Sequence, residues 1–442
     1  MKISLSDHFT YGKMFRFTLP SVVMLIFTSI YGVVDGFFVS NFVGKTPFAA
    51  VNLIMPFLMI LAAVGFMFGA GGGALIARTL GEGEQERANR TFSLLVYVTI
   101  GISLVFTVAS IVFLPSIARA LGAEGKLLDD CVTYGRIILL ALPFNILQFE
   151  FQTFFIVSEK PQLGLAVTVA SGLTNMALDA LFMAVLRWGL PGAALATGIS
   201  QFVGGILPLL YFSRPNSSLL QLGKTTMDKS ALLRTCTNGS SELMSNLSMS
   251  LVSMLYNLQL MKYAGENGVA AYGVIMYVSF IFIAVFLGFS TGIAPVVSFH
   301  FGAGNHTELK NLLKRSFVIV GILSLTMLGG GLLLASPLSG VFVGYDETLM
   351  SLTIRGMRFY AVSFLFSGIA IFGSSFFTAL NDGLTSALIS FLRSLLFQVA
   401  AVLFFPLIWG IDGIWVSIVA AELVAAIVTL IFLGAKRSTF HY

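Results

Sequence analysis

The sequence predicts an all-α integral membrane protein, with twelve transmembrane helices in two six-helix bundles related by a pseudo-two-fold axis along the membrane normal. Three observations predict this fold. First, 57% of the 442 residues are hydrophobic and only 10% are charged, whereas a soluble domain has about 25% charged residues. Second, the chain contains twelve apolar segments, each long enough to supply the roughly 20 residues that cross a bilayer. Third, the second half of the chain repeats the first.

The composition excludes several classes of protein. A soluble chain of this length could not bury so much apolar surface, and the 44 Gly and 42 Phe suit helices that pack closely in lipid. The net charge of +5 is not gathered in a basic cluster, so we expect no nucleic-acid partner. Cys131 and Cys236 form neither a disulfide framework nor a metal-binding spacing. The first apolar segment runs past Val34 without a small-residue cleavage site, so it is expected to be a span and not a signal peptide.

The twelve spans are expected in two sets of six, which gives an N-terminal lobe at 1–212, a cytoplasmic linker at 213–231 and a C-terminal lobe at 232–442. Several segments exceed the minimum length, which indicates tilt or extension beyond the bilayer. The expected spans are 15–40, 48–78, 91–114, 131–157, 161–186, 191–212, 232–262, 268–300, 314–336, 352–379, 384–409 and 413–435.

The two halves match when the sequence is aligned with itself at a constant shift of half its 442 residues. A single offset that holds along the whole chain indicates an internal duplication. Because each repeat has six spans, both halves enter the membrane in the same direction, and a shared cavity is expected between them. The matched residues are Gly71, Gly81 and Gly83 with Gly292, Gly302 and Gly304, Gly135 with Gly356, Phe155 with Phe376, Trp188 with Trp409, and Gln201 with Glu422.

The distribution of Lys and Arg predicts the orientation. If the N-terminus is cytoplasmic, the inner loops and tails hold sixteen of them and the outer loops eight, which favours two cytoplasmic termini. We therefore expect a multi-pass protein of the bacterial inner (plasma) membrane, acting as a monomer. No segment is long enough for a soluble nucleotide-hydrolysing domain. The glycine-rich stretch at 69–73 lacks the Lys and Ser/Thr of a phosphate-binding loop.

Charged residues inside the spans are the strongest functional signal, because an ionised group in hydrocarbon costs several kcal/mol unless it faces a cavity or a partner. Asp35, Asp179 and Thr197 each lie about 12–14 Å from the outer end of their span, at 1.5 Å per residue. Asn175 is one turn from Asp179 on the same face. These four residues predict a cation-coupling site for H⁺ or Na⁺. Asp35 and Asp179 are the candidate ligands of Na⁺.

Structural explanations of the same residues remain open. Each carboxyl could be a neutral, hydrogen-bonded group that packs helices together, and the role of Glu150 stays undecided. Arg393 and Glu422 lie near mid-membrane on neighbouring spans, which predicts a structural ion pair. His300 is expected to be solvated beside an inner loop. The second half carries Tyr256, Leu396 and Ala400 where the first carries Asp35, Asn175 and Asp179, so ion coupling is predicted for the first half alone.

The substrate cavity is expected to be lined by both halves. Aromatic faces attract organic cations and flexible Met side chains adapt to varied shapes, which favours lipophilic cationic small molecules as substrates. The polar candidates for the lining are Gln148, Gln152, Glu242, Asn246 and Asn257.

A family resemblance rests on residues in a fixed order along the whole chain: Asp35-Gly36, Gly44, Pro56, Gly71, Ala77 to Gly83, Asn175 to Asp179 and Gly189 to Thr197. Together they resemble the multidrug and toxic compound extrusion (MATE) antiporters, and Gly239-Ser240-Ser241-Glu242 is most similar to the MepA-like bacterial branch. The resemblance implies export of hydrophobic cations by H⁺ or Na⁺ antiport, without a cofactor. It also implies an essential carboxylate at Asp35 and a cation site shared with Asn175, Asp179 and Thr197. The acidic residue that another branch carries in span 10 has no counterpart in Phe359–Ala379.

Three competing functions are less consistent with the sequence. A lipid-linked oligosaccharide flippase of the same superfamily is the main alternative, but its cavity should hold several basic residues and Arg393 is the only cation deep in a span. A major facilitator transporter should carry a different loop between its second and third spans. An intramembrane enzyme would need clustered acid, base or metal-binding groups, so we expect no enzymatic activity.

Overall fold

The computed structural model describes residues 3–442, except for the side chains at positions 40 and 45. Every regular element in this range is helical, which confirms the predicted all-α class. Three short segments, labelled η, are π-helical. The helices are α1 Tyr11–Phe38, η1 Val39–Val43, α2 Lys45–Gly81, α3 Gln85–Ala120, α4 Gly125–Val157, α5 Pro161–Asp179, η2 Ala180–Val185, α6 Gly189–Ser213, α7 Lys229–Gly302, α8 His306–Val343, α9 Glu347–Ala379, α10 Gly383–Phe391, η3 Leu392–Leu396, α11 Phe397–Phe404, α12 Pro406–Trp409 and α13 Ile411–Phe440.

Eleven helical stretches in the described range are long and apolar enough to cross a membrane, and one of them holds two spans. Helix α7 has 74 residues, about 110 Å at 1.5 Å per residue, which is more than three times the thickness of a bilayer core. Its helical backbone is interrupted at Gly265, with φ 63° and ψ −152°, a conformation that residues with a β-carbon avoid. The two arms of α7 are therefore the predicted spans 7 and 8, and the total of twelve is confirmed.

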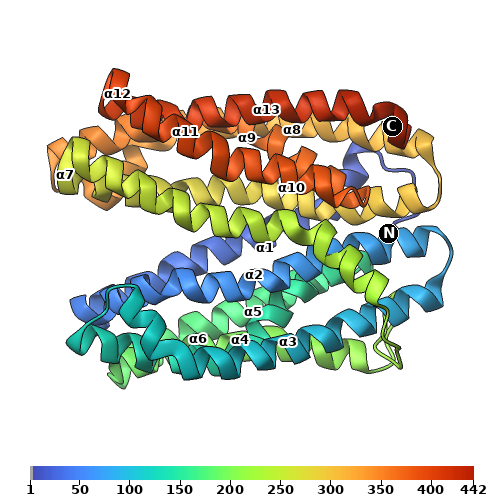
Figure 1. Ribbon diagram of the computed structural model, residues 1–442, viewed down its shortest axis with the longest axis horizontal. Coiled ribbons are helices and arrows are strands. Elements are labelled where there is room, and N and C mark those ends of the chain that lie inside the picture. Colours follow the sequence, from blue (N-terminus) through green and yellow to red (C-terminus); the bar gives the residue numbers. More distant parts are fainter. Residues whose placement is uncertain (1–2) are drawn as a thin grey trace.

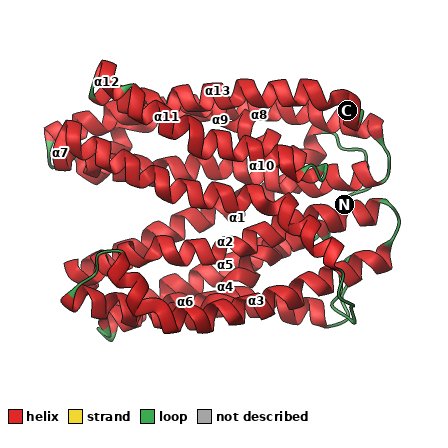
Figure 2. Cartoon of the chain, in the orientation of Figure 1, coloured by secondary structure: helices red, strands yellow, loops and turns green. Residues whose placement is uncertain are grey.

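The helices form two lobes, α1 to α6 and α7 to α13, which lie side by side in Figure 1. Figure 2 shows that short loops join almost all of the helices. Both chain ends and the α6–α7 linker, residues 214–228, lie at one end of the molecule, here named the terminal face. The opposite end is named the far face. Two hydrogen bonds hold the linker against α3. Gln221 N donates to Asn89 Oδ1 at 3.1 Å, and Thr225 Oγ1 donates to the Arg90 carbonyl at 2.7 Å.

The lobes pack backbone against backbone near the terminal face. A β-carbon at Gly81 would lie 2.0 Å from the carbonyl oxygen of Phe299, and a β-carbon at Gly302 would lie 2.0 Å from that of Arg78. The backbones of α2 and α7 therefore approach so closely that only glycine fits at both positions. Any larger residue would push the two helices apart. Gly81 and Gly302 are counterparts in the sequence repeat, so the internal duplication governs the packing of the lobes as well as the sequence.

Toward the far face the lobes diverge (Figure 1). Helix α1 shows where the close packing ends, because all of its buried residues lie between Met14 and Met24. From Leu25 to Phe38 every side chain is half-buried or exposed. The lobes are thus in close contact at the terminal face and diverge toward the far face.

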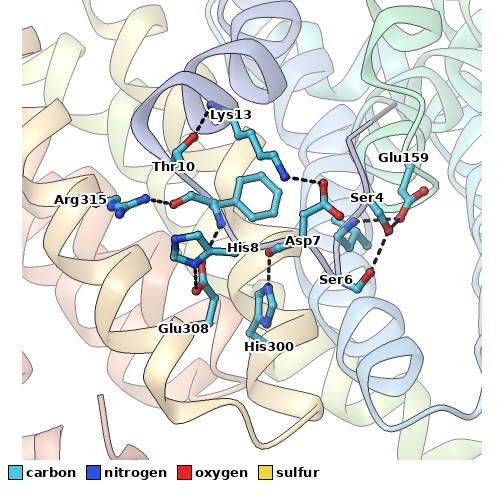
Figure 3. Close-up of polar contacts among 12 residues, drawn as sticks. Ser4, Ser6, Asp7, His8, Thr10, Lys13, Glu159, His300, Glu308 and Arg315 are labelled. Carbon is cyan, nitrogen blue, oxygen red and sulfur yellow. Dashed lines mark hydrogen bonds and ion pairs between the residues drawn. The ribbon is translucent and has the colours of Figure 1, made fainter. Parts of the chain in front are cut away.

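The segment that precedes α1 bridges the lobes at the terminal face, and Figure 3 shows its contacts. This segment, residues 4–10, is named the N-terminal strap. Its start is held by Glu159 of the first lobe, whose Oε1 accepts from Ser4 Oγ at 2.6 Å and from Leu5 N at 2.8 Å. Its end is held by Glu308 of the second lobe, whose Oε1 accepts from Phe9 N at 2.9 Å.

Further contacts fix the strap. His8 Nδ1 lies 2.7 Å from Glu308 Oε2, and the side chains of Leu5 and Phe9 are fully buried in a hydrophobic cluster that contains residues of both lobes. His300 Nε2 lies 3.3 Å from the carbonyl oxygen of Asp7, and the residue is only 3% exposed. The prediction that His300 is solvated was wrong, because the strap covers it.

Candidate functional site

The four predicted cation-site residues meet within the first lobe. Asp35 in α1 faces Asn175 and Asp179 in α5 and Thr197 in α6, near enough for their side chains to interact. Asn175 Nδ2 lies 3.5 Å from Thr197 Oγ1. The π-helical segment η1 begins four residues after Asp35, and η2 begins at the residue that follows Asp179. Such π-helical turns inside α-helices occur frequently at functional sites.

The oxygens of this site are buried without enough donors to satisfy them. Asp179 is fully buried and Asn175 is 1% exposed. Both carboxylate oxygens of Asp179, one of Asp35 and the side-chain oxygen of Asn175 have no hydrogen-bond partner in the described part of the chain. Two like carboxylates in contact cannot both stay ionised without a compensating positive charge. The donor set therefore fits a proton, or a hard cation that prefers oxygen ligands.

Two tyrosines beside the carboxylates were not predicted. Tyr31 and Tyr134 both interact electrostatically with Asp35, and Tyr134 is 1% exposed. Tyrosine in a membrane span is common at interfaces and in packing, so composition does not single these two out. One usable signal was the spacing, because Tyr31 precedes Asp35 by four residues and thus shares its helix face.

The corresponding position of the second lobe holds a neutral hydrogen bond. Tyr256, the counterpart of Asp35 in the repeat, is 1% exposed, and its hydroxyl donates to Gln398 Oε1 at 2.8 Å. The partners of the first lobe, Asn175 and Asp179, are replaced here by Leu396 and Ala400. The repeat therefore preserves the scaffold but not the acidic pair.

A second charged cluster lies in the second lobe. Arg393 in η3 donates through Nε to Glu422 Oε2 of α13 at 2.9 Å, with side-chain exposures of 18% and 4%. Glu242 of α7 is half-buried and interacts with Arg393 through its charge. Because there are two carboxylates for one guanidinium, the cluster has a surplus negative charge at Glu242 when all three groups are ionised.

The remaining cavity candidates are divided between two environments. Gln148 and Gln152 are 4% and 6% exposed and pack inside the first lobe. Gln148 lies against Gly204 of α6, and Gln152 Nε2 is 3.4 Å from Thr168 Oγ1 of α5. These two glutamines thus occupy helix-packing positions. Asn246 and Asn257 on α7 are half-buried, and Asn246 donates to the Glu242 carbonyl at 2.8 Å.

Glu150 is a buried acid outside both clusters. It is fully buried in α4, and neither of its carboxylate oxygens has a hydrogen-bond partner in the described range. It interacts with Thr99 of α3, whose hydroxyl is also buried and has no hydrogen-bond partner among the described residues. An ionised carboxylate would be very costly in such surroundings, so the environment favours the neutral acid.

Comparison with known families assigns the chain. The family model described as MatE matches residues 20–181 and again residues 243–404, once in each lobe. The chain belongs to the MatE family. The double match falls on the two halves of the internal repeat, so one six-span unit of the family is present twice.

Similar proteins and structures agree with this assignment. The chain is 25% identical over 430 residues to the multidrug export protein MepA of Staphylococcus haemolyticus strain JCSC1435, covering 97% of this chain and 94% of that protein. It is 23% identical to MepA of Staphylococcus aureus strain NCTC 8325, with the same coverage. An outward-facing multidrug resistance MATE family transporter of the MOP superfamily has a TM-score of 0.93 at 22% identity, covering 98% of this chain and 97% of that one. The bent conformation of a MATE has a TM-score of 0.90 at 22% identity, covering 99% and 97%. These structures share the fold.

Proposed function

We propose that this MatE-family protein exports hydrophobic organic cations from bacterial cells by antiport with H⁺ or Na⁺. The observation that carries the proposal is the pair Asp35–Asp179, in which three of the four carboxylate oxygens are buried without a hydrogen-bond partner among the described residues. An unpaired acidic pair inside a membrane span is expensive, so it requires a functional explanation. Binding of a coupling cation supplies one.

Coupling follows from charge balance at this site. A proton or Na⁺ that binds there removes the net negative charge with which Asp35 attracts a cationic substrate. The ion and the substrate therefore compete, and linkage requires that each weakens the binding of the other by the same factor. With no cofactor involved, the ion gradient alone supplies the free energy for export.

Helix α1 supplies a mechanism for alternating access. Its first half packs between the lobes and its second half does not. Pro20 removes one helix hydrogen bond, and β-carbons at Gly32 and Gly36 would meet no atom within 4 Å. A helix with these features can take up two bends that differ by a few kcal/mol. Neutralisation of Asp35, which lies beside Gly36, would favour one bend over the other.

Two further considerations support the substrate class and the orientation. The relatives are named multidrug export proteins, and Glu242 gives the second lobe a half-buried negative group that could contact a cationic substrate. The distribution of Lys and Arg favours cytoplasmic termini in a protein of the bacterial inner membrane. On that orientation the far face is extracytoplasmic and the structure is outward-facing. We propose that the transporter acts as a monomer.

The lipid-linked oligosaccharide flippase remains the alternative within the superfamily, but no observation favours it. Such a cavity would need basic groups free to hold a pyrophosphate. Arg393 is committed to Glu422 at 2.9 Å and has Glu242 as a second neighbour. Its charge is thus already balanced by carboxylates.

The test is efflux of ethidium or tetraphenylphosphonium from everted vesicles, with the pH gradient and the Na⁺ gradient imposed separately. We expect one gradient to drive transport by the natural protein and neither to drive transport by Asp35→Asn. Asp129→Asn is a matched control, because Asp129 is an exposed carboxylate near the far-face end of α4. Efflux by Asp35→Asn at the natural rate would remove Asp35 from the mechanism, and efflux that ignores both gradients would contradict antiport.

A further inference from the structure

An open groove of about 730 Å³ lies between α8 and α9, in the half of the second lobe nearest the far face. Eight of its nine lining residues belong to α9, and Leu332 belongs to α8. Beneath the groove the two helices touch, because a β-carbon at Gly331 would lie 2.7 Å from Ala361 Cβ. The groove is therefore a widening between two spans that are in contact deeper in the membrane.

The deeper part of the groove is apolar. Leu332 is 41% exposed, while Phe359 and Val362 of α9 are half-buried. All three lie in helices that are long and apolar enough to cross the bilayer. Apolar surface of this kind suits an acyl chain, because an extended chain gains dispersion contacts along a groove.

The shallower part of the groove is charged, and one of its charges has no partner. Arg355 forms an ion pair with Asp412 of α13. Arg358 lines the same groove and is exposed, but no hydrogen bond or ion pair engages its side chain within the described residues. Glu347, at the first residue of α9, adds one negative charge at the outer rim. Apart from the Arg355 pair, the groove thus presents one positive and one negative group.

The depth of Arg358 places its guanidinium near the lipid phosphates. Helix α9 has 33 residues, about 50 Å, so it exceeds the ~30 Å hydrocarbon core by roughly 10 Å at each end. Arg358 is eleven residues past the helix start, about 16 Å, which puts its Cα roughly 6 Å inside the core. Arginine at this depth extends its side chain outward to the interface. An unpaired guanidinium there requires an anionic partner to offset its cost.

We propose that the groove binds a zwitterionic glycerophospholipid of the far-face leaflet. Its phosphate accepts hydrogen bonds from Arg358, its ammonium faces Glu347, and one acyl chain lies along Leu332, Phe359 and Val362. A guanidinium binds phosphate through paired, charge-assisted hydrogen bonds. The proposal does not depend on the transport function, because the groove lies outside the cation site and outside the seam between the lobes.

The experiment is native mass spectrometry of the purified full chain, titrated with phosphatidylethanolamine, with phosphatidylglycerol and with inorganic phosphate. Arg358→Gln should weaken phosphatidylethanolamine binding about tenfold or more, since it removes the charge-assisted hydrogen bonds to the phosphate. Arg358→Lys keeps the charge but not the paired hydrogen bonds, so it should weaken binding less than Arg358→Gln does. Val362→Trp fills the groove and should also weaken binding, although it leaves both charges in place.

Arg136→Gln is the matched control. Arg136 is exposed and lies eleven residues past the start of α4, the same depth as Arg358 in α9, but it does not line the groove. Unchanged binding in both Arg358→Gln and Val362→Trp would overturn the proposal, as would an equal loss in Arg136→Gln. Equal affinity for phosphatidylglycerol would overturn the zwitterionic assignment. Displacement of lipid by inorganic phosphate would show a simple anion site in place of a lipid site.

Discussion

The N-terminal strap should bias the transporter toward the state that is closed at the terminal face, and Glu308→Ala is the change that tests this. The strap is anchored to both lobes, by Glu159 in the first and Glu308 in the second. Any movement that separates the lobes at this face must break one of the two anchors. We therefore expect loss of the Glu308 carboxylate to raise the population that is open at the terminal face.

The magnitude follows from the interactions that the Glu308 carboxylate makes. Glu308 accepts from Phe9 N at 2.9 Å and from Asn311 Nδ2 at 2.8 Å, and it pairs with His8 at 2.7 Å. Phe9 is fully buried, so its N–H is left unsatisfied in the alanine variant at a cost of about 1–3 kcal/mol. If the free energy of the closed state alone rises by about 2 kcal/mol, the equilibrium between the closed and open states shifts roughly 30-fold toward the open state. Glu308→Gln keeps an acceptor oxygen and should have a smaller effect.

The assay is maleimide labelling of a single cysteine in the seam between the lobes. Ser21→Cys is a suitable reporter, because Ser21 is 1% exposed, its hydroxyl has no hydrogen-bond partner within the described residues, and it lies against Gly288 and Gly292 of α7. Cys131 and Cys236 are first replaced by Ser. We expect Glu308→Ala to raise the labelling rate about 30-fold when opening and closing are fast compared with the reaction, because the rate then follows the open population.

The control is Glu86→Ala at the same face, since Glu86 pairs with Arg90 on the surface of α3 and does not touch the strap. It should leave the labelling rate of the Ser21→Cys reporter unchanged. If Glu308→Ala also leaves the rate unchanged, while the variant is folded as judged by its melting temperature, then the strap does not control the equilibrium between the lobes and the reasoning is refuted.

Three further predictions concern the repeat and its contacts. Asp179→Asn should abolish ion-driven efflux in vesicles, whereas its second-lobe counterpart Ala400→Asp should not create a second coupling site; normal efflux by Asp179→Asn would place the site elsewhere. Gly302→Leu should increase labelling of the Ser21→Cys reporter, because its side chain would meet the α2 backbone. Arg393→Met should destabilise the protein by about 3–5 kcal/mol, as removal of one partner leaves a buried charge, and Arg393→Met with Glu422→Leu should recover most of that loss in thermal unfolding.

The sequence was sufficient to predict the class, the number of spans and the duplication. Hydrophobic length determines where a span can lie, and a single offset of half the chain length links the two halves. The break in α7 lies in the gap between two predicted spans. The sequence did not show that a single residue, Gly265, would make this break without a loop. The meeting of Asp35, Asn175, Asp179 and Thr197 was predicted from depth along each helix.

Depth along a helix says nothing about which way a side chain points across the bundle. This limited the prediction of the cavity lining and of the other neighbours of Asp35. Gln148 and Gln152 were expected in the substrate cavity, but they pack against α6 and α5. Tyr134 was overlooked because its approach to Asp35 depends on how α4 is rotated against α1. The strap was missed for a related reason: residues 4–10 carry no hydrophobic period, and their partners lie about 150 and 300 positions away along the chain.

The internal repeat explains why the chemistry of this protein can be confined to one lobe. The glycine contacts at the seam occur in matched pairs, so both lobes must retain them for the terminal face to close. The acidic pair has no such constraint, since a cation can bind in either lobe without a symmetric mate. Tyr256 and Gln398 satisfy each other where a second acid would have remained unpaired. Each lobe thus keeps the glycines that let the lobes pack together at the terminal face. The first lobe alone keeps the acidic pair on which ion coupling would depend.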